Sequence, residues 1–329
     1  MIKSLEHIKG LWAKLDKNEK LSIYINIPFC KCQCRYCLYK GEPGAGDEEH
    51  RKFVYDYLIP SIKRFHDLFD EHEIETIYFG GGTPNAIPIK YIMDICDATA
   101  CFNRAKNRII EMNPAYCSVQ DVELLTDFGF TLITFGVQSF CKEALNFQQR
   151  PYCSEDKITK LGKAIQSLGG KFSLDIMCYL LKYDKSDLEI FKQDVEIAKR
   201  TNADFVTIYP ELNLILNDEQ AANDFVQCVK NVDWSGYWLD DDTTNIEKTH
   251  RLITRMVKDK YSEEEFYESI LPYYADDFPY ATQNIVSFGA GNGKHDVMSY
   301  VPGEFYYVEV NLGTNTPIYN MKFEEGEPQ

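Results

Sequence analysis

The chain has 329 residues, of which 44% are hydrophobic and 26% are charged. This composition is typical of a soluble globular protein and excludes global disorder. The 35 Lys and Arg residues against 51 Asp and Glu residues give a formal net charge of −16. So acidic a chain is poorly suited to nucleic-acid phosphates or to an anionic membrane surface, both of which need clustered cations, and we expect neither as a partner.

The sequence also predicts where the protein works. No stretch approaches the roughly 20 apolar residues that a membrane helix needs. The first twenty residues lack the apolar core and the small-residue cleavage site of a secretory signal. The 11 cysteines are an odd number in a chain too large to depend on disulfides. We therefore expect a reducing cytoplasm, where clustered thiols more often bind metal than pair with one another.

The first two thirds of the chain alternate short apolar segments with longer amphipathic ones. The segments expected to form strands are rich in β-branched and aromatic residues, and they are 22–27, 74–79, 107–112, 130–136, 171–178 and 203–209. The segments expected to form helices are 51–69, 88–100, 118–128, 155–168 and 186–201, with Ser154 as a candidate N-cap. This alternation predicts an α/β fold with a parallel sheet, either open or curled into a partial or full barrel. Ligands of such sheets bind beyond the carboxyl ends of the strands.

The alternation ends after Pro210. The later segments are two helical patterns at 218–231 and 246–259, an acidic aromatic stretch at 261–280, and strand-like segments at 284–289 and 304–310. We therefore divide the chain into an N-terminal helical segment 1–20, a sheet region 21–214 and a smaller α+β C-terminal extension 215–329 that covers the sheet.

A cysteine-rich loop follows the first predicted strand. Cys30, Cys34 and Cys37 have C-x3-C-x2-C spacing, and Cys32 lies between the first two. Three thiolates from one short loop can bind three corners of a cubane iron–sulfur cluster and leave the fourth iron open. Structural zinc normally takes four ligands, and Cys32 could be the fourth, so the spacing alone leaves zinc as an alternative.

The surrounding residues resemble the radical SAM superfamily, and within it the branch of oxygen-independent coproporphyrinogen III oxidase. That branch has the sequence Y-I-H-I-P-F-C before its cluster loop. This chain has Tyr24-Ile25-Asn26-Ile27-Pro28-Phe29-Cys30, and Tyr36 precedes Cys37 as the family's aromatic residue does. The resemblance implies a partial (β/α)6 barrel. It also implies a [4Fe–4S] cluster held by Cys30, Cys34 and Cys37, with S-adenosylmethionine (SAM) on the open iron.

Further motifs of the family follow in the same order. Gly80, Gly81, Gly82 and Thr83 come after the second strand and match a run whose backbone holds the methionine end of SAM. Glu111, near the end of the third strand, matches a glutamate of the SAM pocket. By itself the glycine run could be only a tight turn, and Glu111 only a solvated turn residue.

Four more residues complete the candidate SAM site. Gln138 lies in the family's G-x-Q-S-F motif, and Arg150 matches the arginine that pairs with the SAM carboxylate, a task suited to a guanidinium. Asp175 matches a strand aspartate that meets the ribose hydroxyls, and an Asp in an apolar strand needs such a partner. Tyr209 lies in a segment that matches the one flanking the adenine in the family, and Tyr24 joins the set from the first strand.

The resemblance implies an enzyme that reductively cleaves SAM to a 5′-deoxyadenosyl radical and abstracts hydrogen from a small molecule or a peptide. It implies a reducing partner such as flavodoxin or ferredoxin. One alternative is a methyltransferase that uses two SAM molecules, and another is a non-catalytic protein of this fold that binds a cluster or heme. The sequence assigns no catalytic residue.

Overall fold

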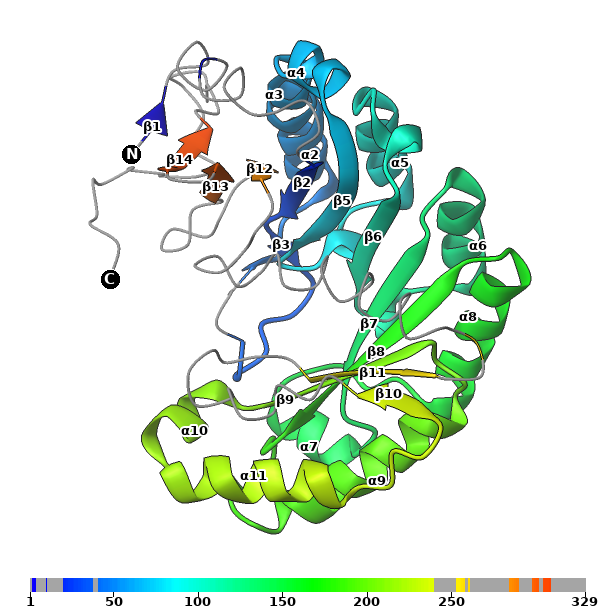
Figure 1. The fold of residues 1–329 in the computed structure, drawn as a ribbon, viewed down its shortest axis with the longest axis vertical. Coiled ribbons are helices and arrows are strands. Elements are labelled where there is room, and N and C mark those ends of the chain that lie inside the picture. Colours follow the sequence, from blue (N-terminus) through cyan, green and yellow to red (C-terminus); the bar gives the residue numbers. More distant parts are fainter. Residues whose placement is uncertain are drawn as a thin grey trace. The chain divides into compact units, whose positions relative to one another are not determined.

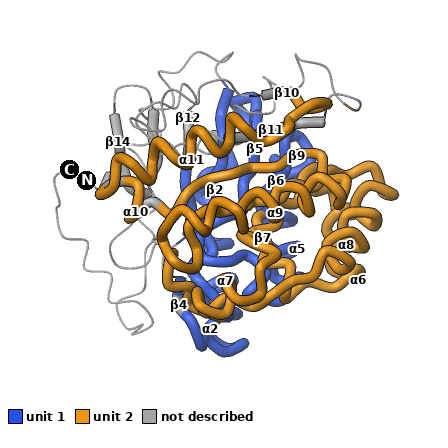
Figure 2. Tube along the Cα trace, turned by 90° about the horizontal axis from the view of Figure 1, so that it is seen from below, with its two compact units in different colours: residues 1–31, 39–110, 280–329 blue, residues 32–38, 111–279 orange. Residues whose placement is uncertain are grey.

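The computed structural model describes residues 2–3, 10, 20–37, 41–239, 253–257, 260, 284–289, 298–301 and 304–308. The chain forms two compact units, which Figure 2 colours separately. Unit 1 comprises residues 1–31, 39–110 and 280–329, and unit 2 comprises residues 32–38 and 111–279. These units do not test the three-part division expected from the sequence, which stays a prediction.

Unit 1 contains a mixed sheet (Figure 1). Its strands, in the order in which they lie side by side, are β1 (Ile2–Lys3), β14 (Glu304–Val308), β13 (Met298–Val301), β12 (Asn284–Gly289), β2 (Lys20–Ile27), β5 (Glu73–Gly81) and β6 (Asn107–Met112). The strands β12, β2, β5 and β6 run parallel, and β13 is antiparallel to both of its neighbours. A two-residue ladder joins β3 (Phe29–Cys30) to β4 (Glu42–Pro43) just after β2.

The helices of unit 1 lie between these strands in the sequence. They are α2 (Asp47–Lys52), the π-helical turn η1 (Phe53–Leu58), α3 (Ile59–Lys63), α4 (His66–Glu71), the 3-10 turns η2 (Pro84–Ala86) and η3 (Phe102–Arg104), and α5 (Ile89–Ala98). The helix expected over 51–69 is present with one interruption: α2, η1 and α3 follow one another without a gap up to Lys63, and a turn at 64–65 separates them from α4. Pro60 lies in the first turn of α3 and has no N–H to donate to the preceding helical turn. The π-helical turn lies directly before it.

Unit 2 continues the alternation with three parallel strands and two antiparallel ones. Its strands, in sheet order, are β7 (Leu132–Gln138), β8 (Lys171–Cys178), β9 (Phe205–Pro210), β11 (Ile253–Val257) and β10 (Tyr237–Leu239). Its helical segments are η4 (Pro114–Tyr116), α6 (Val119–Phe128), α7 (Lys142–Phe147), α8 (Glu155–Ser167), α9 (Asp187–Arg200), α10 (Leu212–Asn217) and α11 (Glu219–Asn231). Ser154 caps α8 as expected, because its side chain accepts a hydrogen bond from the backbone of Lys157.

All six strands predicted for the first two thirds of the chain are present, with ends displaced by at most two residues. The helix expected over 246–259 is wrong where the structure describes it, because 253–257 form β11. The segment is Ile-Thr-Arg-Met-Val, and it pairs antiparallel with β9 from Ile253 to Met256. The open edge of β9 therefore outweighs the helical periodicity of the segment. Most of segment 1–20 and all of 261–280 lie outside the described residues.

The two faces of β8 differ in character, and this difference positions the site of unit 2. Phe172, Leu174 and Ile176 point to one face and are fully buried. Helix α8 packs there, since a Cβ on Gly162 would lie 2.4 Å from the ring of Phe172. The alternate residues of β8, among them Asp175, therefore belong to the opposite face of the sheet.

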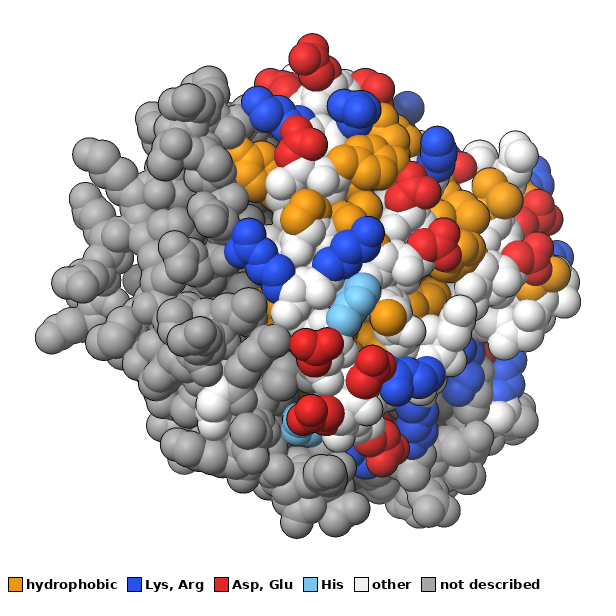
Figure 3. All heavy atoms as spheres, turned by 90° about the horizontal axis from the view of Figure 1, so that it is seen from above, with side chains coloured by type: hydrophobic (Ala, Val, Ile, Leu, Met, Phe, Trp, Pro, Cys, Tyr) orange, Lys and Arg blue, Asp and Glu red, His pale blue; other side chains and the backbone are white. Residues whose placement is uncertain are grey.

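On the face drawn in Figure 3, the described Lys and Arg side chains stand among Asp and Glu side chains, without a continuous basic stripe. None of the described helices combines the length and the apolar character that crossing a bilayer would need.

Candidate functional site

The first cysteine of the loop lies in unit 1, at the carboxyl end of β2. Cys30 belongs to β3, and its Sγ lies 3.4 Å from the hydroxyl of Thr83. Tyr24, on β2, stacks on Tyr78 with ring centroids 5.8 Å apart, and its hydroxyl donates to Asn26 at 3.4 Å. The strands β2 and β5 thus bring Tyr24, Cys30 and Thr83 to one end of their sheet.

The glycine run packs closely against that loop. Gly81 has a φ of +103°, and a Cβ there would lie 2.3 Å from Oδ1 of Asn26. A Cβ on Gly82 would lie 2.7 Å from the carbonyl oxygen of Phe29 and 3.1 Å from Sγ of Cys30. The backbone N–H of Gly82 donates to the carbonyl of Ile27 at 2.9 Å. No larger residue fits between β5 and the start of the cysteine loop.

Two further glycines complete this arrangement. A Cβ on Gly80 would lie 2.8 Å from the hydroxyl of Tyr24. A Cβ on Gly41, which the sequence did not single out, would lie 2.4 Å from Sγ of Cys30. The sulfur of Cys30 therefore sits in a cradle of bare backbone, which suits a thiolate that must reach a bulky ligand.

The other cysteines of the loop lie in unit 2. The Sγ atoms of Cys32 and Cys34 are 3.9 Å apart, and the backbone N–H of Cys37 donates to the carbonyl of Cys34. The hydrogen bond from Cys32 and the nearby cation of Arg150 lower the pKa of Cys34 to about 5, although burial opposes the shift. The same hydrogen bond, together with burial, raises the pKa of Cys32. These surroundings favour the thiolate form of Cys34, which is the form that binds metal.

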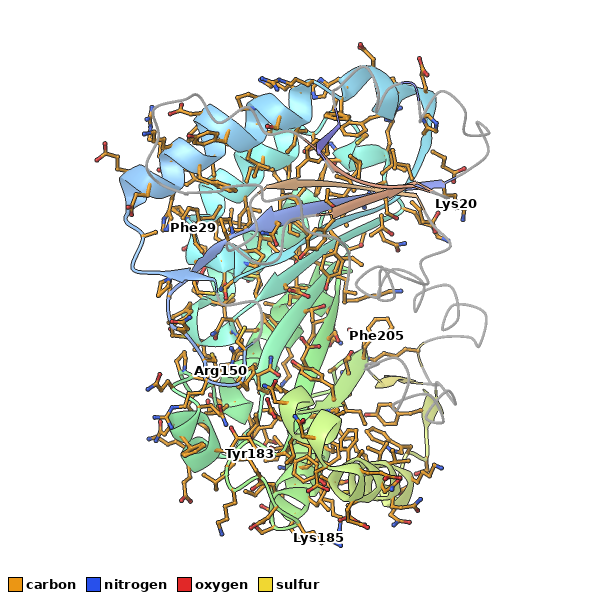
Figure 4. The ribbon with its side chains drawn as sticks, turned by 90° about the vertical axis from the view of Figure 1, so that its left-hand side faces the viewer. Lys20, Phe29, Arg150, Tyr183, Lys185 and Phe205 are labelled. Carbon is orange, nitrogen blue, oxygen red and sulfur yellow. The ribbon has the colours of Figure 1, made fainter. Side chains whose placement is uncertain are left out.

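Arg150 is the cation beside that thiolate. Its Nη1 donates to Sγ of Cys34 at 3.5 Å, and its Nη2 donates to the carbonyl of Gly136 near the end of β7. Burial disfavours the charged guanidinium, but Tyr36 and Cys34 outweigh it and raise the pKa of Arg150. In Figure 4, Phe205 marks the beginning of β9, and Arg150 lies towards the other, carboxyl ends of the strands.

Gln138 and Tyr209 meet at the same strand ends. The hydroxyl of Tyr209 donates to Oε1 of Gln138 at 2.6 Å. Gln138 has a φ of +69°, which is rare for a residue with a side chain and is common at functional sites. Burial first, and then the charge of Asp175, raise the pKa of Tyr209. Tyr209 therefore stays a neutral hydrogen-bond donor.

Asp175 and Glu111 are placed by their strands. Asp175 pairs with Gly136 on β7 and with Thr207 on β9, on the face opposite to α8. It is partly exposed, as is Glu111, the penultimate residue of β6. Unit 2 thus gathers Cys34, Arg150 and Asp175 around the carboxyl ends of its parallel strands, as expected for a ligand site.

Asp194 supports the site but is not among the residues predicted from the sequence. Asp194, in α9, accepts hydrogen bonds from the hydroxyl of Ser139 at 2.5 Å and from the backbone N–H of Phe140 at 2.8 Å. It therefore holds the turn that presents Gln138. The available signal was its position on the apolar stripe of α9, beside the buried Val195 and Ala198.

Within the described part of the chain, the predicted cluster cysteines do not form one metal-binding group. No three His, Cys, Asp or Glu side chains there form a group able to hold a metal ion. Cys30 belongs to unit 1, whereas Cys34 and Cys37 belong to unit 2. The assignment of these three cysteines as cluster ligands stays a prediction.

Comparison with known proteins identifies the family. The model of the radical SAM superfamily matches residues 24–195, which is more than half of the chain. The chain belongs to the radical SAM superfamily. The cofactors of that family, a [4Fe–4S] cluster and SAM, are the ones that the cysteine loop and the glycine run predicted.

The relatives come from the branch that the motifs indicated. The heme chaperone HemW of Buchnera aphidicola (subsp. Schizaphis graminum) is 26% identical over 192 residues, which are 57% of this chain and 50% of that protein. The oxygen-independent coproporphyrinogen III oxidase of Salmonella typhimurium is 29% identical over 138 residues, 40% of this chain and 29% of that one. The chain spans about half the length of the heme chaperones that it matches.

A solved structure confirms the fold class. Coproporphyrinogen III oxidase (HemN) from Escherichia coli superposes with a TM-score of 0.69 at 18% identity. The match covers 91% of this chain and 69% of that one. The α/β fold with a partial barrel of parallel strands, expected from the sequence, is therefore the fold of this protein.

Proposed function

We propose that the protein is a radical SAM enzyme that abstracts hydrogen from a small-molecule or peptide substrate. The observation that carries this proposal is the Cys34 thiolate, hydrogen-bonded to the Arg150 cation at the carboxyl ends of parallel strands. A purely structural cysteine would be a neutral thiol in apolar surroundings. Membership of the superfamily supports the same reading.

The thiol donors of the loop suit an iron–sulfur cluster by their chemistry, although the described side chains do not form a ready metal-binding group. Cys30, Cys34 and Cys37 would hold three irons, and the surroundings of Cys34 lower the pKa of its thiol. The bare backbone of Gly41 and Gly82 leaves room around Cys30. Cys32 would remain a thiol, because its pKa is raised by its hydrogen bond with Cys34.

SAM would take the polar groups at the strand ends. The backbone from Gly80 to Gly82, with Thr83, would receive its methionine end. Tyr24, Glu111 and Gln138 would contribute to the SAM pocket. Arg150 would face the carboxylate, and Asp175 the ribose hydroxyls, because a guanidinium and a carboxylate complement those groups. Tyr209, a neutral donor bonded to Gln138, would lie in the segment that flanks the adenine.

The chemistry that cluster and SAM supply together is reductive cleavage of SAM to methionine and a 5′-deoxyadenosyl radical, which takes a hydrogen atom from the substrate. The electron would come from a reducing protein such as flavodoxin or ferredoxin, in a reducing cytoplasm. The chain's own part is to hold both cofactors, orient SAM and keep Cys34 ionised.

A second candidate rests on the names of the relatives, several of which are heme chaperones. In this reading the protein keeps the fold and the cluster, and it binds heme rather than acting on a substrate.

Product analysis separates these candidates. The protein is reconstituted anaerobically with iron and sulfide, supplied with SAM and a reductant, and tested with and without heme. Formation of 5′-deoxyadenosine supports the enzyme. Additional S-adenosylhomocysteine would indicate a methyltransferase. Stoichiometric heme binding without either product would favour the chaperone and overturn the proposed enzyme.

A further inference from the structure

Arg150, which we propose to bind the SAM carboxylate, also contacts one of the predicted cluster cysteines. Its two terminal nitrogens are directed at protein atoms, Nη1 at Sγ of Cys34 and Nη2 at the carbonyl of Gly136. The Nη1–Sγ separation is 3.5 Å, within the range of an N–H···S hydrogen bond given the larger radius of sulfur. The guanidinium therefore contacts a predicted cluster ligand directly.

The orientation of this guanidinium is fixed by its surroundings. Gly136 has no side chain, and a Cβ there would lie 3.0 Å from Nη2 of Arg150. The aromatic residues Tyr36 and Tyr209 lie close enough to raise the pKa of this guanidinium. Tyr36 and Tyr209 also pack on the buried cluster of Ala144, Met177 and Leu180. A cation held so firmly at a sulfur atom acts as a fixed charge and not as a mobile surface group.

Such a contact has a defined effect on a cluster. Hydrogen bonds to the sulfurs and the local charge are two of the features that set the reduction potential of iron–sulfur centres. Reduction adds one electron to the cluster and makes it more negative. A cation and an N–H donor at one of its thiolates stabilise that reduced form more than the oxidised form.

We infer that Arg150 is a positioning residue that raises the reduction potential of the cluster by donating an N–H···S hydrogen bond to Cys34. This inference rests on the proposed function, because it needs a cluster on Cys34. It goes beyond the SAM-binding role, since it predicts an effect of Arg150 when SAM is absent.

The test measures the cluster's potential without SAM. Reconstituted wild type, Arg150→Gln and Arg150→Lys are titrated anaerobically with dithionite, and the reduced cluster is counted by electron paramagnetic resonance. Arg35→Gln is the matched control. Arg35 lies in the same loop, but its guanidinium lies over the ring of Phe147 at 5.0 Å and not on a cysteine.

At one applied potential, we expect the ratio of reduced to oxidised cluster to fall about tenfold in Arg150→Gln, the size expected for a hydrogen bond to a charged group. Tenfold corresponds to 59 mV for a one-electron couple. Arg150→Lys keeps the charge but not the fixed fork, so its ratio should lie between the two. Arg35→Gln should match the wild type.

Several results would overturn the inference. One is a wild-type ratio in Arg150→Gln, and another is an equal fall in Arg35→Gln, which would indicate net charge alone. If Arg150→Gln assembles no cluster, the test rests on Arg150→Lys. A wild-type ratio of reduced to oxidised cluster in Arg150→Lys would then overturn the inference. If the wild type cleaves SAM and the Arg150 variants have the same cluster potential as the wild type, this inference is wrong but the proposed function stands. A wild type that assembles no cluster overturns the proposed function as well.

Discussion

The carboxyl group of Asp194 in α9 and the hydroxyl of Ser139 in the turn after β7 are 2.5 Å apart. This pair ties the turn that carries Gln138 to a helix behind the sheet. Burial raises the pKa of Asp194 to about 7, although Ser139 and Phe140 donate hydrogen bonds to it. The folded protein therefore holds this proton more tightly than the unfolded chain does.

The sign of the resulting pH dependence follows. Between the ordinary pKa of 3.8 and about 7, the folded state is protonated at Asp194 and the unfolded state is not. The stability that Asp194 contributes is complete below this window and falls as the pH rises through it. We expect Asp194→Asn to remove that decline, measured by urea unfolding at steps from pH 4 to 8. A difference from wild type that is the same at every pH would contradict the assignment.

Cys32 and Cys34 should respond differently to replacement. Cys34→Ala should abolish the cluster, as should Cys30→Ala and Cys37→Ala, because each removes one predicted thiolate ligand. Cys32→Ala should keep the cluster and SAM cleavage. Iron and sulfide content and the visible absorption spectrum are the measurements. Loss of the cluster in Cys32→Ala would point to four-thiolate ligation, or to zinc.

Gly82→Ala should damage the start of the cysteine loop. The added methyl group would meet backbone oxygens of Pro28 and Phe29 at 3.0 and 2.7 Å, atoms that cannot move aside as a flexible side chain would. We expect a loss of about 1–3 kcal/mol in the free energy of unfolding, together with lower iron uptake. Gly46→Ala is the control, since the nearest atom to its Cβ would be 3.9 Å away. Equal stability of the two variants would show that the cradle is not tight.

Thr207→Val should stabilise the protein. The hydroxyl of Thr207 is fully buried and has no hydrogen-bond partner among the described residues. Valine has almost the same shape, so the change removes only a desolvated polar group, for a gain of about 1 kcal/mol. Thr201→Val is the matched control, because the buried hydroxyl of Thr201 donates to Ala198 at 2.7 Å and its loss should destabilise. Destabilisation of both variants would mean that Thr207 has a partner.

Asp175→Asn should weaken SAM binding and leave the cluster intact. The amide keeps the shape but loses the charge that accepts hydroxyl hydrogen bonds, a difference of about ten- to a hundredfold in affinity. Equilibrium binding to the reconstituted protein measures it. If Asp175 serves only the fold, the variant will lose thermal stability without SAM, and the folded fraction will bind SAM with wild-type affinity.

The strands were predictable from sequence because they are short, rich in apolar residues and mostly buried, as in β8, where all residues except Lys171 and Asp175 are buried. Candidate site residues could be proposed because they stand at strand ends in a recognisable order. The helix over 51–69 is interrupted only by a turn at 64–65. The segment at 253–257 depended on an open edge of β9 that periodicity cannot reveal.

The supporting contacts were beyond the sequence for a different reason. Asp194 reaches Ser139 across 55 positions, and Arg150 reaches Cys34 across 116. Gly41 appears as an ordinary turn glycine until Sγ of Cys30 is seen beside it. Local patterns carry no information on pairs so far apart, because the fold alone brings them together.

The pairing of β2 with β12 has a consequence for the folding of the chain during its synthesis. Leu21 pairs with Asn284, so one edge of β2 stays open while the chain between them leaves the ribosome. That edge belongs to a strand whose Leu21, Ile23, Ile25 and Ile27 are all fully buried in the finished fold. A nascent chain stopped short of 284–289 thus displays a hydrophobic strand edge, the kind of surface that chaperones bind and that promotes aggregation.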